Sequence, residues 1–467
     1  MNDGFSRRGI GFVLVVFGLC AGACALPWTS RFSARRVPHP QVTDRSAGVA
    51  SATFQPSATS QPAVATVLPL SSPTLLPSPT PMPTATATAA PLPQGWRAPQ
   101  SLTPGPVRLH RLRMVDSKRG WALGTQQGEG PRVLVTDDGA RTWREVSPPL
   151  LPPDVQADAV QTLFWDATTA WVAYGHEAAE PSQLAAGVWV THDRGTTWTW
   201  APIPWPEEMA IPWFRPGPLT AVDAQRAWLL VHLDAGMGHD YALLVSTTDG
   251  GQRWDVLADP SSPRAADLMT MFTSDLAFAP DGRYGWATKD AGPIAAAVVV
   301  STRDGGRSWR THAFIPSGDD EAFCSTRDPH VWAPGEGVVL VLCLAEDAPG
   351  HRVFVARWSM DVLPVEGAPT AEDASMMFPT ADEGYVAVYP ANTGASTRRT
   401  LLFVTTDGGA TWASAGEYPW TGLFSWLPGG EGWALADDGL DVRVMHTTDR
   451  GRTWEPLPMP KIIEKEP

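Results

Sequence analysis

The chain has 467 residues, and its 49 acidic residues outnumber 35 lysines and arginines, which gives a formal net charge of −14. This balance argues against a general nucleic-acid binder or a protein that docks on anionic membranes, because both need a basic surface. With only four cysteines, the chain is not a small disulfide-rich scaffold.

The first 24 residues have the pattern of an export signal. Arg7 and Arg8 precede an apolar run at 10–19, and the small residues 21–23 lead to Cys24. The run is shorter than the roughly 20 apolar residues of a membrane span. This ending resembles a bacterial lipoprotein signal, in which Cys24 is lipidated and becomes the mature N-terminus. A twin-arginine signal and an uncleaved anchor stay open as alternatives, and each places the body outside the cytoplasm.

Residues 25–106 are expected to form a disordered linker. Proline, alanine, threonine and serine dominate this stretch, as at 78–89. Such a composition has too few large apolar side chains for a core, so an extended and partly polyproline chain is expected. The folded body is then predicted at 107–460, followed by a tail at 461–467.

An eight-residue pattern recurs six times, and its clearest copy runs from Thr302 to Trp309 as Thr-Arg-Asp-Gly-Gly-Arg-Ser-Trp. The first four copies are about 55 residues apart, and the next gap is about twice as long. Such a period identifies a repeat architecture. The aspartates and tryptophans of the six copies are Asp138 and Trp143, Asp193 and Trp198, Asp249 and Trp254, Asp304 and Trp309, Asp407 and Trp412, and Asp449 and Trp454.

Ahead of most copies stands a second motif of the Gly-Trp-Ala type, as at Trp121, Trp286 and Trp433. Each unit contains four short β-prone runs separated by turn residues, which in the first unit lie near 112–115, 121–124, 133–135 and 143–146. We therefore predict an all-β, seven-bladed β-propeller with four-stranded antiparallel blades. The fifth blade is degenerate, because it has lost the eight-residue pattern.

The octapeptide is expected to form the turn between the third and fourth strands. Its aspartate can accept backbone hydrogen bonds, its glycine supplies a positive φ, and its tryptophan starts the fourth strand. The motif resembles the Asp-box, or bacterial neuraminidase repeat. That resemblance implies a structural turn at the blade periphery, remote from the binding face. Together with the Gly-Trp-Ala motif, it makes residues 107–460 resemble the photosystem II assembly and stability factor family. The resemblance implies membrane-protein partners bound through an arginine-lined face, whereas arginines are scattered along this sequence.

Cys324 and Cys343 fall within the degenerate fifth unit. If Cys24 is the anchor, these two remain in the mature body, and an exported protein can join them in a disulfide. Two separate buried thiols are the alternative.

Two segments are candidates for a ligand face. A loop of the third blade contains two imidazoles and two carboxylates, which could hold a metal, although a solvated polar loop is the favoured interpretation and no metal or other cofactor is predicted. The stretch before it offers aromatic faces beside carboxylates, which suits sugars. The candidate residues are His232, Asp234, His239, Trp205, Trp213 and Arg215.

These observations predict a non-catalytic, extracytoplasmic and monomeric propeller, lipid-anchored to a bacterial membrane. Its expected role is to bind a protein partner or to help assemble a membrane complex, without a nucleic-acid ligand. The alternative is a glycoside hydrolase, a sialidase-like enzyme or a carbohydrate-binding surface protein. A Phe-Arg-Ile-Pro motif typical of sialidases is matched only by Phe214-Arg215-Pro216, which lacks the isoleucine.

Overall fold

The computed structural model describes residues 91–463, except for 206–210, 237–238, 291–295, 317–322, 346–347, 360 and 392–397. The predicted signal with Cys24, the linker up to residue 90 and the last four residues lie outside this range. No helix in the described part is long and apolar enough to span a membrane.

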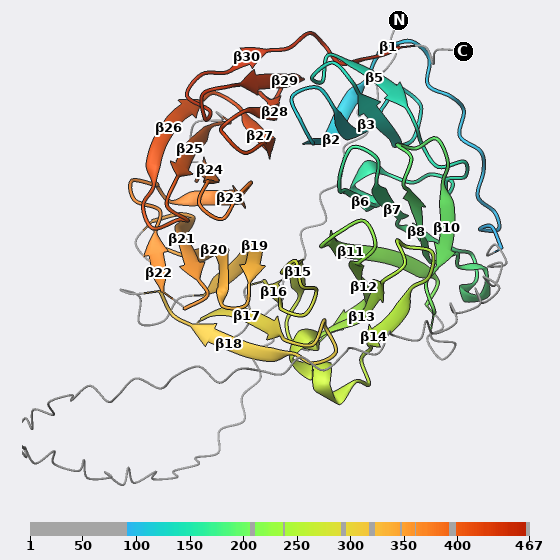
Figure 1. Ribbon diagram of the computed structural model, residues 1–467, viewed down its shortest axis with the longest axis horizontal. Helices are drawn as coiled ribbons and strands as arrows, with labels where there is room; N and C mark the ends of the chain where they lie inside the picture. Colours follow the sequence, from blue (N-terminus) through green and yellow to red (C-terminus); the bar gives the residue numbers. More distant parts are fainter. Residues whose placement is uncertain are drawn as a thin grey trace, which may run out of the picture. The chain divides into compact units, whose positions relative to one another are not determined.

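The body is an all-β propeller in which seven four-stranded antiparallel blades surround a central channel (Figure 1). The innermost strand of each blade comes first in sequence. The first blade consists of β2 (Arg108–Met114), β3 (Gly120–Thr125), β4 (Arg132–Thr136) and β5 (Thr142–Glu145), and the second of β6 (Val160–Phe164), β7 (Ala170–Tyr174), β9 (Gly187–Thr191) and β10 (Thr199–Pro202). The third blade consists of β11 (Trp213–Ala221), β12 (Ala227–Gly236), β13 (His239–Thr247) and β14 (Asp255–Ala258), and the fourth of β15 (Thr273–Phe278), β16 (Gly285–Lys289), β17 (Ala297–Thr302) and β18 (Arg310–Phe314). The fifth blade consists of β19 (Cys324–Ala333), β20 (Glu336–Leu344), β21 (His351–Arg357) and β22 (Val362–Pro364), the sixth of β23 (Ala371–Met377), β24 (Gly384–Pro390), β25 (Thr400–Thr405) and β26 (Ala413–Tyr418), and the seventh of β27 (Thr421–Trp426), β28 (Gly432–Asp437), β29 (Val442–Thr447) and β30 (Glu455–Pro456).

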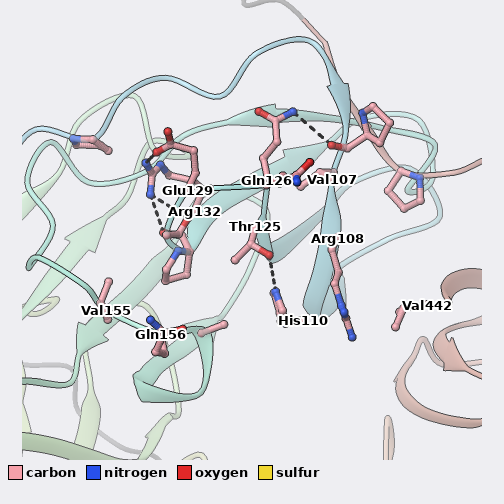
Figure 2. Close-up of a pocket in the computed structure, with 18 of the residues that line it drawn as sticks. Val107, Arg108, His110, Thr125, Gln126, Glu129, Arg132, Val155, Gln156 and Val442 are labelled. Atoms are coloured by element: carbon pink, nitrogen blue, oxygen red, sulfur yellow. Dashed lines mark hydrogen bonds and ion pairs between the residues drawn. The ribbon is translucent and has the colours of Figure 1, made fainter. Parts of the chain in front are cut away.

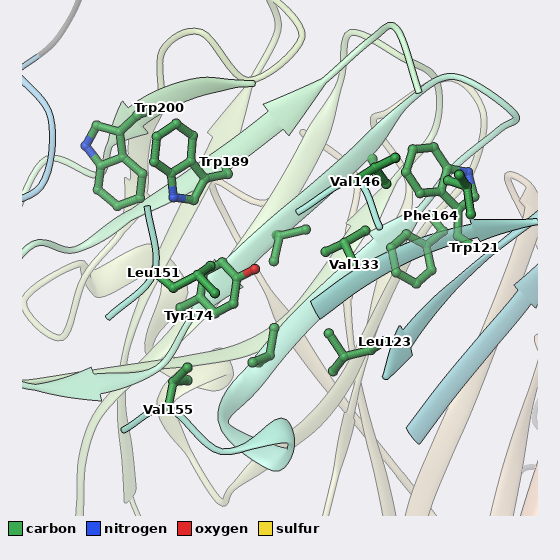
Figure 3. Packing of buried hydrophobic residues seen from close by; sticks show 14 of the residues in the cluster. Trp121, Leu123, Val133, Val146, Leu151, Val155, Phe164, Tyr174, Trp189 and Trp200 are labelled. Carbon is green, nitrogen blue, oxygen red and sulfur yellow. The ribbon is translucent and has the colours of Figure 1, made fainter. Parts of the chain in front are cut away.

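The middle strands of each blade are apolar runs because neighbouring blades cover both of their faces. In β17, for example, all six residues are buried. The cluster between the first and second blades shows this packing (Figure 3), with Trp121 stacked on Phe164 at a ring distance of 5.5 Å. Burial on both faces explains why the middle strands lack the polar–apolar alternation of a half-exposed sheet.

Two faces of the ring follow from this antiparallel order. The octapeptide face has the turns between first and second strands and between third and fourth strands, and the two sets are hydrogen-bonded to each other. In the first blade Gly139 N–H donates to Lys118 O at 2.9 Å, and in the fourth Gly305 N–H donates to Arg283 O at 2.9 Å. The opposite face, called here the groove face, has the turns between second and third strands and the connections between blades.

The octapeptide turn is built around its aspartate. Asp304 Oδ1 accepts hydrogen bonds from the Thr302 hydroxyl (3.0 Å) and the Ser308 N–H (2.9 Å), and Oδ2 accepts from the Ser308 hydroxyl at 2.6 Å. In the sixth blade the same arrangement, above all the hydrogen bond from Thr411, lowers the pKa of Asp407 to about 2. These carboxylates are therefore held by their own turns.

Two short strands, one near each end of the described part of the chain, lie at the outer edge of the first blade. β31 (Lys461–Ile462) runs parallel to β5 and pairs with β1 (Gly105–Pro106). Residues 461–462 are therefore part of the sheet rather than of the predicted tail. The folded part also starts before the predicted linker end at 106, because Trp96 is buried against Tyr174 and Trp200. Composition does not predict the burial of a single apolar residue in a proline-rich stretch, because the residues that bury it are distant in sequence.

Cys324 of β19 and Cys343 of β20 are directly paired across the two strands and joined by a disulfide. Both are buried. The disulfide therefore links the two inner strands of the fifth blade, whose fourth strand has three residues.

Candidate functional site

The largest candidate site is a groove on the groove face, over the first blade (Figure 2). One cavity of about 1140 Å³ lies between the segment 97–100, the turn 126–131, the connection 151–157 and the turn 437–442 of the seventh blade. A second cavity of about 640 Å³ continues into the channel. The two share Arg108, His110, Asp437 and Val442, so they form one groove that leads from the rim to the channel.

Arg132 organises the outer part of the groove. Its side chain is buried, and Nη2 donates to Gln100 O (3.2 Å) and to Glu129 Oε2 (2.9 Å). Nε lies 3.2 Å from Glu145 Oε1, while Glu145 Oε2 accepts the Leu102 N–H. One guanidinium thus fixes the segment 97–102 and the turn at 129 to the blade, which fits the bidentate donor geometry of arginine.

The junction of the two cavities is electropositive. Arg108 is exposed there, and its guanidinium has no hydrogen bond or ion pair with any residue that the structure describes. His110 bonds to the Thr125 hydroxyl at 2.7 Å. Burial, then the charges of Arg108 and Arg111, lowers the pKa of His110, which keeps the imidazole neutral. Arg108 is therefore the free cation with which an anionic group of a ligand can pair.

Of the acidic residues that line the groove, Glu129, Asp373, Asp437 and Asp441 lie within 4.0 Å of an arginine, whereas Asp154 and Glu372 have no ion pair among the described residues. Glu129 pairs with Arg132, and Asp437 Oδ2 lies 2.5 Å from Arg398 Nη1. The residues lining the larger cavity also include no phenylalanine, tyrosine or tryptophan on which a sugar ring could stack.

Two carboxyl groups with raised pKa lie elsewhere, on inner strands β15 and β19. Burial raises the pKa of Asp275 and of Asp328, and repulsion by Asp275 raises that of Asp328 further. Asp275 Oδ2 accepts the Asp328 N–H at 3.2 Å, and Asp328 Oδ2 accepts the Met376 N–H at 2.7 Å. They join the fourth, fifth and sixth blades, and neither lines the groove.

The histidine loop of the third blade is arranged differently from a metal site. His232 Nδ1 lies 3.0 Å from Asp240 Oδ1, and its ring stacks on Phe272 at 4.3 Å. Asp234 is exposed on β12, and the side chain of His239 lies outside the described residues. Among the side chains that are described, no three metal-ligating groups come together.

The aromatic segment before this loop packs on its own blade. Trp213 Nε1 donates to Leu233 O at 3.0 Å, and Arg215 lies 5.0 Å from the Trp213 ring. Trp205 contacts Phe214 edge-to-face at 6.3 Å. Like His232 and Asp234, these three residues do not line the groove.

Comparisons with known proteins return solved structures of low sequence identity. No family model and no curated protein matches the sequence. Among solved structures, "YCF48 bound to D1 peptide" matches with 16% identity and a TM-score of 0.41, over 77% of this chain and 97% of that one. The GH74 xyloglucanase from Xanthomonas campestris matches with 16% identity and a TM-score of 0.47, over 76% of this chain and 54% of that one. A PL25 ulvan lyase matches with 10% identity and a TM-score of 0.45, over 79% and 96% of the two chains. At these identities the likeness concerns the propeller fold alone.

Sequence reasoning did not find the groove. The arginines of β2, at 108, 111 and 113, seemed scattered because the first strand was expected only near 112–115, whereas β2 starts at Arg108. Their spacing within one inner strand was the available signal. The sequence contains no comparable signal for the contact between Arg132 and Gln100, because these residues are 32 positions apart.

Proposed function

We propose that this protein is a non-catalytic, extracytoplasmic propeller that binds a protein partner in the groove over its first blade. The observation that carries the proposal is the continuity of the two cavities through Arg108 and His110. A long open groove with a free cation and few aromatic side chains suits an extended polypeptide with an acidic group better than a sugar chain.

Membrane attachment through lipidated Cys24 is part of the proposal. It is supported by the small residues before this cysteine and by the proline-rich stretch between it and the body. In a bacterial host, Cys24→Ala should move the protein from the membrane fraction to the soluble one. An unchanged membrane fraction would contradict the anchor while leaving the groove proposal intact.

Groove binding is tested by filling the groove. Gln127 is exposed, lines the larger cavity and makes no side-chain hydrogen bond with described residues. The wild type should recover a specific partner by affinity purification from detergent-solubilised membranes. Gln127→Trp should therefore abolish this recovery. Gln225→Trp is the matched control, because Gln225 is equally exposed on the octapeptide face. Equal recovery with both variants, or recovery of nothing specific by the wild type, would overturn the proposal.

A carbohydrate-active enzyme is the second candidate, and the pair Asp275 and Asp328 favours it. Raised pKa values are a requirement for a carboxylic acid that protonates a glycosidic oxygen. Polysaccharide cleavage by the wild type that Asp328→Asn abolishes would establish this alternative. Since both carboxyls accept backbone hydrogen bonds from neighbouring blades, we prefer a structural role for them.

A further inference from the structure

A separate cavity of about 730 Å³ occupies the central channel. Its lining comes from the inner strands of all seven blades or the residues directly after them. It is centred on the ends of these strands, where the chain turns toward the octapeptide face. It shares Leu423 with the smaller cavity of the groove and no residue with the larger one. Arg108 lines only the groove, whereas Arg113 lines this cavity and a smaller neighbouring one.

The walls of this channel cavity are apolar. Leu112, Leu163, Leu276, Trp332 and Leu423 come from five different blades and face the same space. The described residues that line it include no aspartate or glutamate. A volume of this size is in the range of small-molecule sites, roughly 300–1,000 Å³.

Two arginines of β2 are the charged groups of the lining. Arg111 Nη1 donates to the Val160 carbonyl oxygen at 2.5 Å. Arg113 is partly exposed to the cavity, and its side chain has neither a hydrogen bond nor an ion pair with any described residue. The partial burial of its guanidinium lowers its pKa. A guanidinium that lies beside apolar walls and has no protein partner can form a charge-assisted pair with an anionic ligand.

The remaining titratable group of the lining does not compete for this anion. Burial lowers the pKa of His330 to about 4, so its imidazole is neutral. Its Nε2 accepts the Phe378 N–H at 3.3 Å and is not free to bind a ligand. Among the described residues, Arg113 is therefore the charged group of the lining whose side chain has no hydrogen bond or ion pair.

We propose that the channel cavity binds an amphiphilic carboxylate, such as a medium-chain fatty acid, with the carboxylate on Arg113 and the alkyl chain against the leucines. The planar guanidinium can hold a carboxylate through two parallel hydrogen bonds. The apolar walls take up the chain by excluding water from it. The carboxylate site does not depend on the proposed groove function, and either proposal can fail without the other.

The experiment is calorimetric titration of the purified full chain with dodecanoate and, separately, with dodecanol. Both ligands are used below their aggregation limits. The chains match in length, so the carboxylate is the difference. Dodecanoate should bind at least ten-fold more tightly than dodecanol. This ratio corresponds to a difference of about 1.4 kcal/mol in binding free energy, which the charge-assisted pair with Arg113 would supply. Equal affinities, or no binding of dodecanoate, would overturn the proposal without recourse to any variant.

Variants then assign the carboxylate to its arginine. Arg113→Met should lower dodecanoate affinity about ten-fold or more while leaving dodecanol binding unchanged. Arg108→Met, in the groove, is the matched control and should bind dodecanoate like the wild type. Arg113→Lys keeps the charge but loses the bidentate geometry. Its affinity for dodecanoate should therefore lie between that of the wild type and that of Arg113→Met. Circular dichroism verifies that Arg113→Met folds. If the folded variant binds dodecanoate with wild-type affinity, the assignment of the carboxylate to Arg113 is contradicted.

Discussion

The indole Nε1 of Trp228 donates a hydrogen bond of 3.0 Å to the carbonyl oxygen of Gly305, which belongs to the octapeptide turn of the next blade. Trp433 reaches Gly139 in the same way across the junction of the seventh and first blades, at 3.3 Å. The two sequence motifs therefore act together. At these two junctions the tryptophan of the second strand binds the octapeptide turn of the next blade, so the blades are joined by a directed contact as well as by apolar burial.

Loss of this inter-blade hydrogen bond gives a first prediction. Trp228→Phe should destabilise the protein more than Trp171→Phe, because both remove similar buried ring volume but the Trp171 Nε1 has no acceptor among the described residues. The expected difference in the free energy of unfolding is about 0.5–1.5 kcal/mol, the net value of one such bond. Urea denaturation followed by fluorescence measures it, and equal losses would show that the bond contributes nothing.

The octapeptide aspartates give a second prediction. Asp304 accepts two bonds from Ser308, whereas Asp249 faces Arg253 and accepts only its N–H, since that residue has no hydroxyl. Asp304→Ala should therefore lower the free energy of unfolding by roughly 1–3 kcal/mol more than Asp249→Ala. Denaturant midpoints of the two variants provide the measurement, and a larger effect at Asp249 would refute this account of the turn.

The repeats made the fold predictable from the sequence, because each octapeptide is held by bonds between residues at most four apart, such as Thr302 to Asp304. Such short-range patterns survive in the order of residues. The groove depends on contacts that have no local signature, such as Arg132 to Gln100 and Arg398 to Asp437. The boundary errors have the same cause, since Trp96 and Ile462 are buried by residues distant in sequence.

The disulfide of the fifth blade gives a third prediction. Cys324 and Cys343 close a loop with a sequence separation of 19 residues. Replacing both with alanine should cost about 3 kcal/mol, the chain-entropy value for a loop of this size. Wild-type protein should lose a similar amount in a strong reductant, measured by denaturation with and without it. The double variant is the control and should not respond to reductant; a wild type that is equally stable in both conditions would argue against any bracing role.

The carboxyl of Asp328 gives a fourth prediction, which concerns pH. Its pKa is raised by burial and by the Asp275 charge, while Arg327 acts in the opposite direction and Asp373 in the same one. In the unfolded chain Asp328 has an ordinary pKa of about 4 and loses its proton first. The folded state then holds more protons, so this residue's contribution to stability falls as pH rises from about 4 through the raised folded value.

Asp328→Asn removes that titration and should flatten the pH dependence. Asparagine retains an oxygen that can accept the Met376 N–H, and it tolerates the positive φ of 48° at this position. Between pH 5 and pH 8 the variant should therefore lose less stability than the wild type, measured as urea midpoints at both values. Asp382→Asn is the control for the change of charge, because Asp382 is exposed in the sixth blade and should leave the wild-type slope in place. If Asp328→Asn and the wild type have the same slope, the proton is not held at Asp328, and the inner-strand contact to Met376 is made by an ionised carboxylate throughout this range.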